Sequence, residues 1–171
     1  MEKYSDIPVS KLSEERDPEK EQDLLKRMKR HDSWEILQAA GYAQRVIKGR
    51  WPEAEPYIIR TPESAYYYAD HVLNDRWPEA EPQILKSPKY SYWYALRVIK
   101  GRWPEAESTI LESPESAAAY TQNIIKGRWP EAEEVLKKDP EAWEEYLGVL
   151  EYLGQDIDVW EEETEESHVW D

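Results

Sequence analysis

Apolar residues recur along this chain at the spacing of a single helical face. In residues 62–75, four of them stand at positions i, i+3, i+4 and i+7, namely Ala65, Tyr68, Ala69 and Val72. This spacing brings the side chains onto one face of an α-helix. The pattern returns at Ser91, Tyr94, Ala95 and Val98, at Ala117, Tyr120, Thr121 and Ile124, and at Trp143, Tyr146, Leu147 and Leu150. It predicts an all-α protein.

Each apolar stripe is preceded by a helix start signal and followed by a stop signal. The starts are Thr61-Pro62, Ser87-Pro88, Ser113-Pro114 and Asp139-Pro140. Thr, Ser and Asp are good N-caps, and a proline at the first helical position loses no hydrogen bond. The stops are Gly49, Gly101 and Gly127, with Asp75 in the equivalent place of one repeat. We expect these glycines to end the helices as C-caps.

A second, shorter helix is predicted before each of these starts. Its apolar residues are Ile58-Ile59, Ile84-Leu85 and Ile110-Leu111, with Leu136 in the last repeat. Pro56 and Pro82 each lie four residues after another proline. A helix that began at the first proline would lose a hydrogen bond at the second. We therefore expect Trp-Pro-Glu-Ala to form a turn or a loose first turn.

Four columns of residues share a period of 26 residues. The most legible is the motif Arg-Trp-Pro-Glu-Ala-Glu, which contains Trp51, Trp77, Trp103 and Trp129. The other columns contain the tyrosines of the stripe, the aliphatic residues that end it, and the prolines that start each longer helix. Helical hairpins repeated at a fixed period stack into α-solenoids. The sequence therefore predicts an α-solenoid of about five helical hairpins.

The two ends of the chain depart from the repeat. Residues 17–49 are interpreted as a diverged cap unit, with helix starts at Asp17-Pro18 and Asp32-Ser33, and the repeats occupy residues 50–154. A stacked array needs polar caps, because its inner units each bury two faces. We expect residues 1–16 to be weakly ordered, residues 17–154 to form the helical repeat domain, and residues 155–171 to form an acidic tail.

Two motifs carry a resemblance to a known group of proteins. Gly-Arg-Trp-Pro-Glu-Ala-Glu at 49–55 and Ser-Pro-Glu-Ser-Ala at 113–117 resemble a tandem repeat of uncharacterised proteins from tailed bacteriophages and some bacteria. The resemblance covers about residues 47–150, most of the chain. It implies a phage or mobile-element origin, and it transfers no catalytic or binding residue.

The residues that every repeat keeps are expected to be structural. Each tryptophan is expected to wedge between consecutive hairpins. Each tyrosine hydroxyl needs a polar partner near the edge of the core. Each arginine is expected to pair with a glutamate of a neighbouring motif, in an exposed and individually weak ion pair. The alternative is that Arg-Trp forms a repeated ligand-binding edge.

The residues that vary between repeats are the candidates for binding. They are Tyr66 and Tyr67 in the first repeat, Tyr92 and Trp93 in the second, Ala118 and Ala119 in the third, and Glu144 and Glu145 in the fourth. Tyr57 and Tyr90 add two further aromatic residues. An aromatic patch that grades into acidic residues is typical of a protein-binding surface. The alternative is that these rings cover an irregular part of the core or pack against the N-terminal segment.

The C-terminal tail combines acidic residues with Trp160 and Trp170. Acidic tails are usually solvated, and tryptophans within one indicate docking. The tail is predicted to dock either on a basic partner or on the basic stretch Lys26-Arg27-Met28-Lys29-Arg30 of the same chain. The two alternatives remain open at this stage.

The net charge of −15 limits the classes of partner. It disfavours nucleic acid and anionic lipid, and a basic protein surface is its natural complement. The chain has no cysteine, no apolar signal segment at its N-terminus and no apolar run long enough to cross a bilayer. We expect a cytoplasmic protein, in the host cell cytoplasm if the chain is phage-encoded.

No residue pattern predicts catalysis. His31, His71 and His168 are scattered without metal-ligand spacing, and no glycine-rich phosphate loop is present. Glu53 and Glu55 diverge on a helix and do not make an acid/base pair. We therefore expect a protein without enzymatic activity, cofactor or metal, whose oligomeric state is open.

The function expected from these observations is protein binding. The chain would sequester or inhibit a host protein, such as a defence or nucleic-acid-binding factor, through its acidic and aromatic surface. The alternative is a structural or assembly protein that self-associates or binds a virion component.

Overall fold

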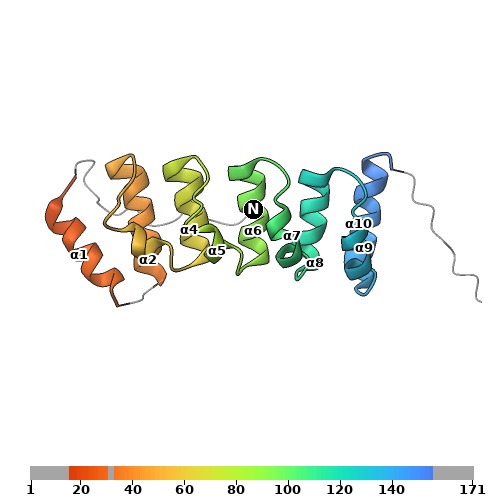
Figure 1. Ribbon diagram of the computed structural model, residues 1–171, viewed down its shortest axis with the longest axis horizontal. Coiled ribbons are helices and arrows are strands. Elements are labelled where there is room, and N and C mark those ends of the chain that lie inside the picture. Colours follow the sequence, from red (N-terminus) through yellow and green to blue (C-terminus); the bar gives the residue numbers. More distant parts are fainter. Residues whose placement is uncertain (1–15, 31–32, 156–171) are drawn as a thin grey trace, which may run out of the picture.

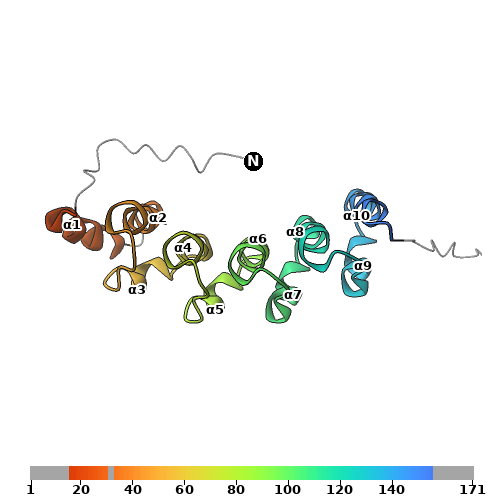
Figure 2. The same cartoon turned by 90° about the horizontal axis from the view of Figure 1, so that it is seen from above.

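The described part of the chain is a row of helical hairpins stacked in series. The computed structural model describes residues 16–30 and 33–155, and within these ranges it contains helices and no strand. The longer helices stand side by side in one layer, and the shorter helices form a second layer beside them (Figure 1, Figure 2). The prediction of an all-α helical repeat is confirmed.

The helices follow the 26-residue period. The cap unit (16–49) contains α1 (Pro18–Met28), α2 (Ser33–Tyr42) and the π-helix η1 (Ala43–Ile47). Repeat 1 (50–75) contains α3 (Glu55–Ile58), α4 (Pro62–Tyr68) and η2 (Ala69–Leu73), and repeat 2 (76–101) contains α5 (Glu81–Ile84), α6 (Pro88–Tyr94) and η3 (Ala95–Ile99). Repeat 3 (102–127) contains α7 (Pro104–Ile110), α8 (Pro114–Tyr120) and η4 (Thr121–Ile125), and repeat 4 (128–155) contains α9 (Pro130–Leu136) and α10 (Pro140–Tyr152).

The shorter helices differ in length because of a second proline. In repeats 1 and 2, where Pro56 and Pro82 are present, the helix has four residues and is preceded by a turn. In repeats 3 and 4, Ser108 and Glu134 replace these prolines, and the helix has seven residues and begins at the first proline. The backbone N–H that proline lacks therefore decides where the helix begins. The predicted turn is confirmed in repeats 1 and 2 only.

The longer helices begin at the predicted prolines. Thr61 Oγ1 accepts a hydrogen bond from the Ser64 N–H at 3.2 Å, and Ser113 and Asp139 cap their helices in the same way. Ser87 has the extended backbone of an N-cap but makes no such side-chain bond. The backbone geometry and the proline thus set the start even where the capping hydrogen bond is missing.

The longer helices do not end as the sequence predicted. Each inner helix widens into a five-residue π-helix, and the residue after it adopts left-handed backbone dihedrals. That residue precedes the predicted stop residue, a glycine in three units and Asp75 in repeat 1, and its φ values are 56° at Lys48, 52° at Asn74, 61° at Lys100 and 56° at Lys126. Gly49, Gly101 and Gly127 are not in the left-handed region. The prediction that these glycines are the C-caps is therefore wrong, because the widened last turn moves the left-handed position back by one residue.

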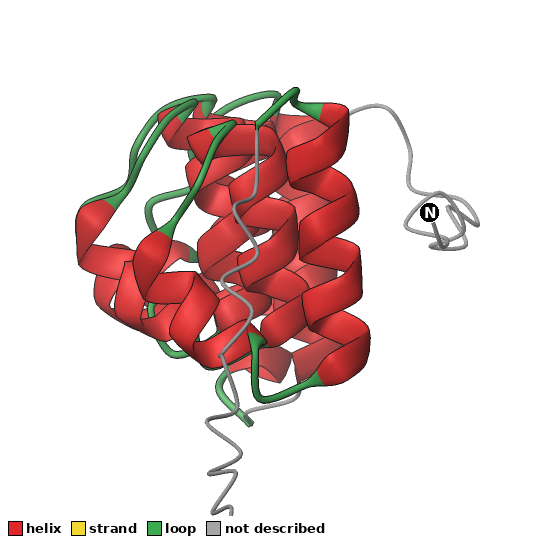
Figure 3. Ribbon diagram, turned by 90° about the vertical axis from the view of Figure 1, so that its right-hand side faces the viewer, coloured by secondary structure: helices red, strands yellow, loops and turns green. Residues whose placement is uncertain are grey.

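The predicted apolar stripe forms the core between the layers. Ala65, Tyr68 and Ala69 are fully buried, and their counterparts are buried in repeats 2 and 3, whereas in repeat 4 Tyr146 is buried and Trp143 and Leu147 are half-buried. Each tryptophan of the motif packs on the tyrosine of the preceding unit, with ring centroids 5.0–5.5 Å apart. The predicted wedge between consecutive hairpins is therefore present. Viewed end-on, the two layers lie beside each other along the whole array (Figure 3).

The array is bowed and has distinct ends. The row of longer helices curves so that its two ends are displaced to the same side, away from the shorter helices (Figure 2). α1 packs on α2 at one end and α10 forms the other. The longer helices thus line the concave face, and the shorter helices line the convex face.

Candidate functional site

The repeated motif and the tyrosine of the same repeat form one hydrogen-bonded network. In repeat 1, Arg50 Nε and Nη2 each donate to a carboxylate oxygen of Glu55 at 2.8 Å. The Tyr68 hydroxyl donates to Glu55 Oε1 at 3.0 Å and accepts from the Trp51 backbone N–H at 2.6 Å. This Arg–Glu–Tyr–Trp network recurs in repeats 2 to 4 with distances of 2.7–3.2 Å, through Arg76, Trp77, Glu81 and Tyr94, through Arg102, Trp103, Glu107 and Tyr120, and through Arg128, Trp129, Glu133 and Tyr146.

The network fixes the protonation states of its own members. Burial raises the pKa of Tyr120 and of Tyr146 to about 12. The hydrogen bonds from Arg50 and Arg128 lower the pKa of their glutamate partners, Glu55 and Glu133, below the usual 4.5. The tyrosines therefore stay protonated and these carboxylates stay ionised at neutral pH. Such groups suit hydrogen bonding rather than proton transfer.

The cap unit contains a variant of the same network. Arg16 donates two hydrogen bonds to Glu21, at 2.9 and 3.0 Å, and the Tyr42 hydroxyl donates to Glu21 at 3.3 Å. The Asp17 N–H takes the place of the tryptophan N–H and donates to Tyr42 at 3.1 Å. The described cap unit therefore includes Arg16, the residue before the expected boundary at 17.

The sequence contains a match to the repeated motif in the cap unit, but the match does not follow the 26-residue period. Residues 16–21 are Arg-Asp-Pro-Glu-Lys-Glu, which match the repeated motif at the arginine, the proline and both glutamates. Tyr42 lies 26 residues after Arg16, whereas Tyr68 lies 18 residues after Arg50. Since the cap helices are longer, a search at constant period misses the match.

The expected pairing of each arginine with a neighbouring motif is wrong. The partner is the second glutamate of the arginine's own motif, because the turn between them returns the chain onto itself. The pKa of Arg50 is raised chiefly by its hydrogen bond with Glu55, and Glu79 of the next motif adds only a smaller electrostatic attraction. With 60% of the Arg50 side chain exposed, the stabilisation by each pair is modest.

The alternative of an Arg-Trp ligand-binding edge would need exposed indole rings, and the tryptophans of the motif are buried. The four tryptophans of the motif are only 2–4% exposed. Their rings are covered by the tyrosine of the preceding unit, and their backbone N–H groups are bonded to the tyrosine of their own repeat. The constant residues therefore build the scaffold.

Variable residues of the longer helices join the first three pairs of neighbouring units, each by a different contact. The Tyr67 hydroxyl donates to Gln44 Oε1 between the cap unit and repeat 1. Arg97 Nε lies 3.5 Å from the Asp70 carboxylate between repeats 1 and 2. Between repeats 2 and 3, a different pair forms, in which Asn123 Nδ2 donates to the Tyr92 hydroxyl at 3.1 Å. These contacts are specific to each junction, unlike the repeated network.

Several of the predicted binding aromatics take part in packing. Tyr92 is only 7% exposed, as the alternative interpretation expected. Tyr66 and Tyr90 are half-buried, with ring centroids 5.9 Å apart across the junction of repeats 1 and 2. Tyr67 is half-buried and stacks on His71 at 4.2 Å. The structure thus brings Tyr66 and Tyr90 together, and it leaves only part of the surface of Tyr66, Tyr67 and Tyr90 open.

Trp93 is the most open of the described candidates. It lies on α6, in the middle of the row of longer helices, with 37% of its surface exposed and its ring 5.1 Å from that of Tyr92. Tyr57 lies apart from it on α3, in the convex layer, with the Arg60 guanidinium 4.7 Å from its ring centroid. Trp160 and Trp170 lie outside the described residues.

The concave face changes character along the array. The positions of Tyr66 and Tyr67 are taken by alanines in repeat 3 and by the exposed pair Glu144 and Glu145 in repeat 4. The face therefore runs from aromatic in repeats 1 and 2 to acidic in repeat 4. This surface of variable residues is the candidate functional site.

The described residues also bear on other classes of site. Residues 16–30 and 33–155 contain no group of three or more His, Asp or Glu side chains placed to hold a metal ion. Among the same residues, no helix is both long and apolar enough to cross a membrane.

Comparison with known proteins adds no name to this site. The chain matches no protein-family model, no curated protein and no solved structure.

Proposed function

We propose that this chain is a non-enzymatic helical-repeat protein that binds another protein through its concave face. One observation carries the proposal. Every repeat keeps the residues of the Arg–Glu–Tyr–Trp network, which are used within the scaffold, while the concave face varies and leaves Trp93 exposed. Repeat proteins bind partners with such variable surfaces on a constant frame.

The chemistry of the face defines the partner we propose. The partly exposed Trp93, whose ring lies against the buried Tyr92, provides an anchor, since aromatic residues are enriched at interface centres. The acidic side chains of α10 and the net charge of −15 favour a basic protein surface. A nucleic-acid-binding or defence protein of a host cell has such a surface. Within this proposal, the chain is phage-encoded and inhibits that protein by covering its basic site.

Substitution at the concave face tests this proposal. Binding proteins are captured from a host lysate on the full chain, and the affinity of the recovered partner is measured by calorimetry. Trp93→Ala should weaken binding by about 2 kcal/mol, as expected for a hot-spot aromatic. Glu144→Lys with Glu145→Lys should slow association, and added salt should do the same to the unmodified chain.

A matched control separates binding from folding. Trp34 is 47% exposed on α2, compared with 37% for Trp93, and Trp34→Ala removes an exposed indole from the cap unit, which contains none of the candidate binding residues. It should leave the affinity unchanged. Failure to capture any protein, or equal affinity for the Trp93→Ala and Trp34→Ala variants, contradicts the proposal.

The alternative of an assembly protein that stacks end to end is less well supported. In the inner units, the tyrosine that every unit shares is covered by the tryptophan of the next unit. In repeat 4, Trp143 of the same helix stacks on Tyr146 instead, at 5.3 Å and 23°. At the other end, Asp17 replaces the tryptophan that could enter another copy. Light scattering across concentration distinguishes the two functions, since we expect a monomer.

A further inference from the structure

The edge of the array at the C-terminal ends of the longer helices carries a row of lysines. Lys48, Lys100 and Lys126 stand at the same register, in the turn that follows each longer helix, and all three are exposed. Asn74 occupies this register in repeat 1, and Tyr152 occupies it in repeat 4. We call the three residues the lysine edge.

The backbone alone does not explain lysine at this register. The left-handed conformation crowds the β-carbon of any residue except glycine, and Asn tolerates it best among the others. Asn74 fits this rule, but Lys48, Lys100 and Lys126 do not. A glycine follows each of these lysines, in space where an added β-carbon would meet nothing within 4 Å. The positive charges are therefore held at a backbone position that glycine would fill with less strain.

The lysine edge is electrostatically unpaired within the described residues. The neighbouring arginines Arg102 and Arg128 are bonded to the glutamates of their own motifs. The ammonium groups of the three lysines take part in no hydrogen bond or ion pair with any residue that the structure describes. Each such turn thus contributes one uncompensated positive charge to the edge.

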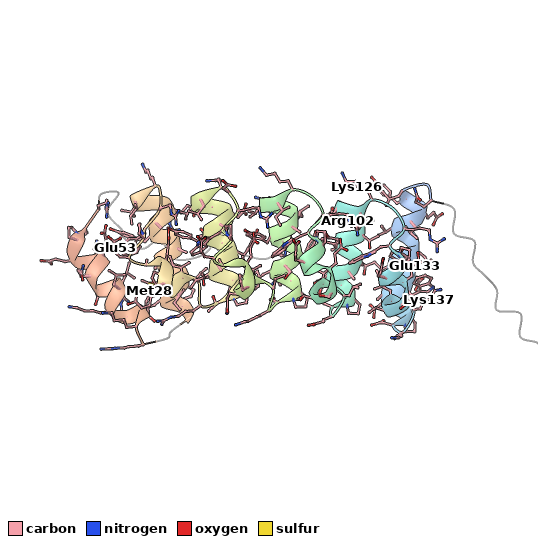
Figure 4. The ribbon with its side chains drawn as sticks, in the orientation of Figure 1. Met28, Glu53, Arg102, Lys126, Glu133 and Lys137 are labelled. Carbon is pink, nitrogen blue, oxygen red and sulfur yellow. The ribbon has the colours of Figure 1, made fainter. Side chains whose placement is uncertain are left out.

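The acidic tail begins at this same edge. α10 ends at Tyr152, and a left-handed Gly154 with a hydrogen bond from Gln155 N to Leu150 O at 2.9 Å terminates it. α10 packs against η4, and its C-terminal end lies at the upper edge of the array (Figure 1). Lys126 lies at that upper edge as well (Figure 4). The described chain therefore ends, at Gln155, next to the C-terminal end of the lysine edge.

The charge and reach of residues 156–171 match this row. The segment contains eight Asp or Glu residues and no Lys or Arg. Sixteen extended residues span at most about 55 Å. Lys126 and Lys100 belong to the two preceding helices, about 10 and 20 Å away at usual packing distances. The alternative receiver, the basic stretch at 26–30, lies on and after α1 at the far end of the array.

We propose that the lysine edge is the docking surface for the acidic tail, residues 156–171, of the same chain. The tether holds the acidic residues near Lys126 and Lys100 at an effective concentration in the millimolar range, about that of a short flexible linker. Docking there leaves the concave face open, so the inference does not depend on the partner proposed above.

The absence of cysteine from the chain allows a direct test. Ser167→Cys supplies a unique thiol for a nitroxide label in the tail of the full chain. The label should broaden amide signals around Lys126 and Lys100 in the nuclear magnetic resonance spectrum. Raising the salt to about 1 M, where the screening length is about 3 Å, should restore these signals.

Charge-reversal variants of the labelled chain decide the outcome. Lys100→Glu with Lys126→Glu should abolish the broadening, whereas Lys138→Glu, an exposed lysine at the opposite end of α10, should leave it intact. Broadening centred on residues 26–30, broadening equal in all variants, or none at all, overturns the proposal. A further control mixes nitroxide-labelled chains that carry no isotope with isotope-enriched chains that carry no label. If the broadening arises only between such separate molecules, the proposal is also overturned.

A second measurement tests the proposal without any substitution, in case the double variant fails to fold. Carbodiimide joins lysine amines to carboxylates in direct contact and can be applied to the unmodified full chain. Peptide mapping should find tail carboxylates joined to Lys126 and Lys100 within one chain. Products at Lys26 or Lys29, or no tail product, contradict the inference.

Discussion

At the scale of the residue, the tyrosine of each unit is the centre of the scaffold. Tyr68 is fully buried, and its hydroxyl both accepts from a backbone N–H and donates to Glu55. The sequence predicted that this hydroxyl needs a polar partner, because a buried phenol must be hydrogen-bonded. It did not predict which glutamate is the partner, since that choice depends on how the turn after Trp51 folds back.

Acid should weaken the scaffold at this residue. The pKa of Glu55 is below its usual 4.5, because Arg50 and Tyr68 donate hydrogen bonds to the carboxylate. A lowered folded-state pKa stabilises the fold at pH values above the unfolded value, and this stabilisation is lost as the pH falls through the folded value. We expect Glu55→Gln to lower the free energy of unfolding by about 1–3 kcal/mol at neutral pH.

Urea unfolding across pH checks this prediction. The difference between the variant and the unmodified chain should shrink below about pH 4.5, where Glu55 of the unfolded chain becomes protonated. Glu53→Gln, at an exposed position two residues away, serves as the control and should change little. A pH-independent difference for Glu55→Gln would show that the carboxylate charge has no part in the network.

At the scale of the element, helix starts followed the sequence and helix stops did not. The starts depend on local features, an N-cap residue and a proline, which act within one turn. The stops depend on the π-helical last turn, which carries the left-handed position to Lys48, Lys100 and Lys126. No residue type in the sequence marks that widening. The glycines were therefore wrongly predicted to be the C-caps.

Substitution at two neighbouring positions of one turn should change the stability by different amounts. Lys100 has a φ of 61°, a conformation that a β-branched residue adopts only with strain. Lys100→Val should therefore lower the free energy of unfolding by about 1–2 kcal/mol. Gly101→Ala should change it by less than about 0.5 kcal/mol, because the added β-carbon meets nothing within 4 Å. Denaturant midpoints that rank these two variants in the reverse order would contradict the assigned cap position.

At the scale of the whole molecule, the described array is covered at its C-terminal end, in repeat 4. Each inner tyrosine needs the tryptophan of the following unit, and repeat 4 has Gln155 where that tryptophan would be. Trp143 covers the ring of Tyr146 from within α10, at a register where the other units have the small residues Ala39, Ala65, Ser91 and Ala117. One large residue at a position of small ones therefore ends the repeat.

Removing this cover should expose the end of the array. Trp143→Ala should lower stability by about 2 kcal/mol, since the indole is half-buried. Hydrogen exchange should accelerate in α10 before the other helices. Glu144→Ala, the exposed neighbour, is the control. Light scattering of the Trp143→Ala variant should also show self-association through the bared Tyr146, and uniform exchange across all helices would refute its capping role.

The sequence by itself determined the helices, the period and the buried face, because the spacing of apolar residues and the starting prolines act through local backbone geometry. It also separated constant from variable residues. Only the tertiary structure decided what the variable residues do. Tyr92 and Tyr67 are joined to residues 31 and 23 positions away, at Asn123 and Gln44. Such contacts depend on how far each unit is rotated on the next, which no local pattern encodes. The same stacking of one unit on the next leaves the Trp93 side chain exposed.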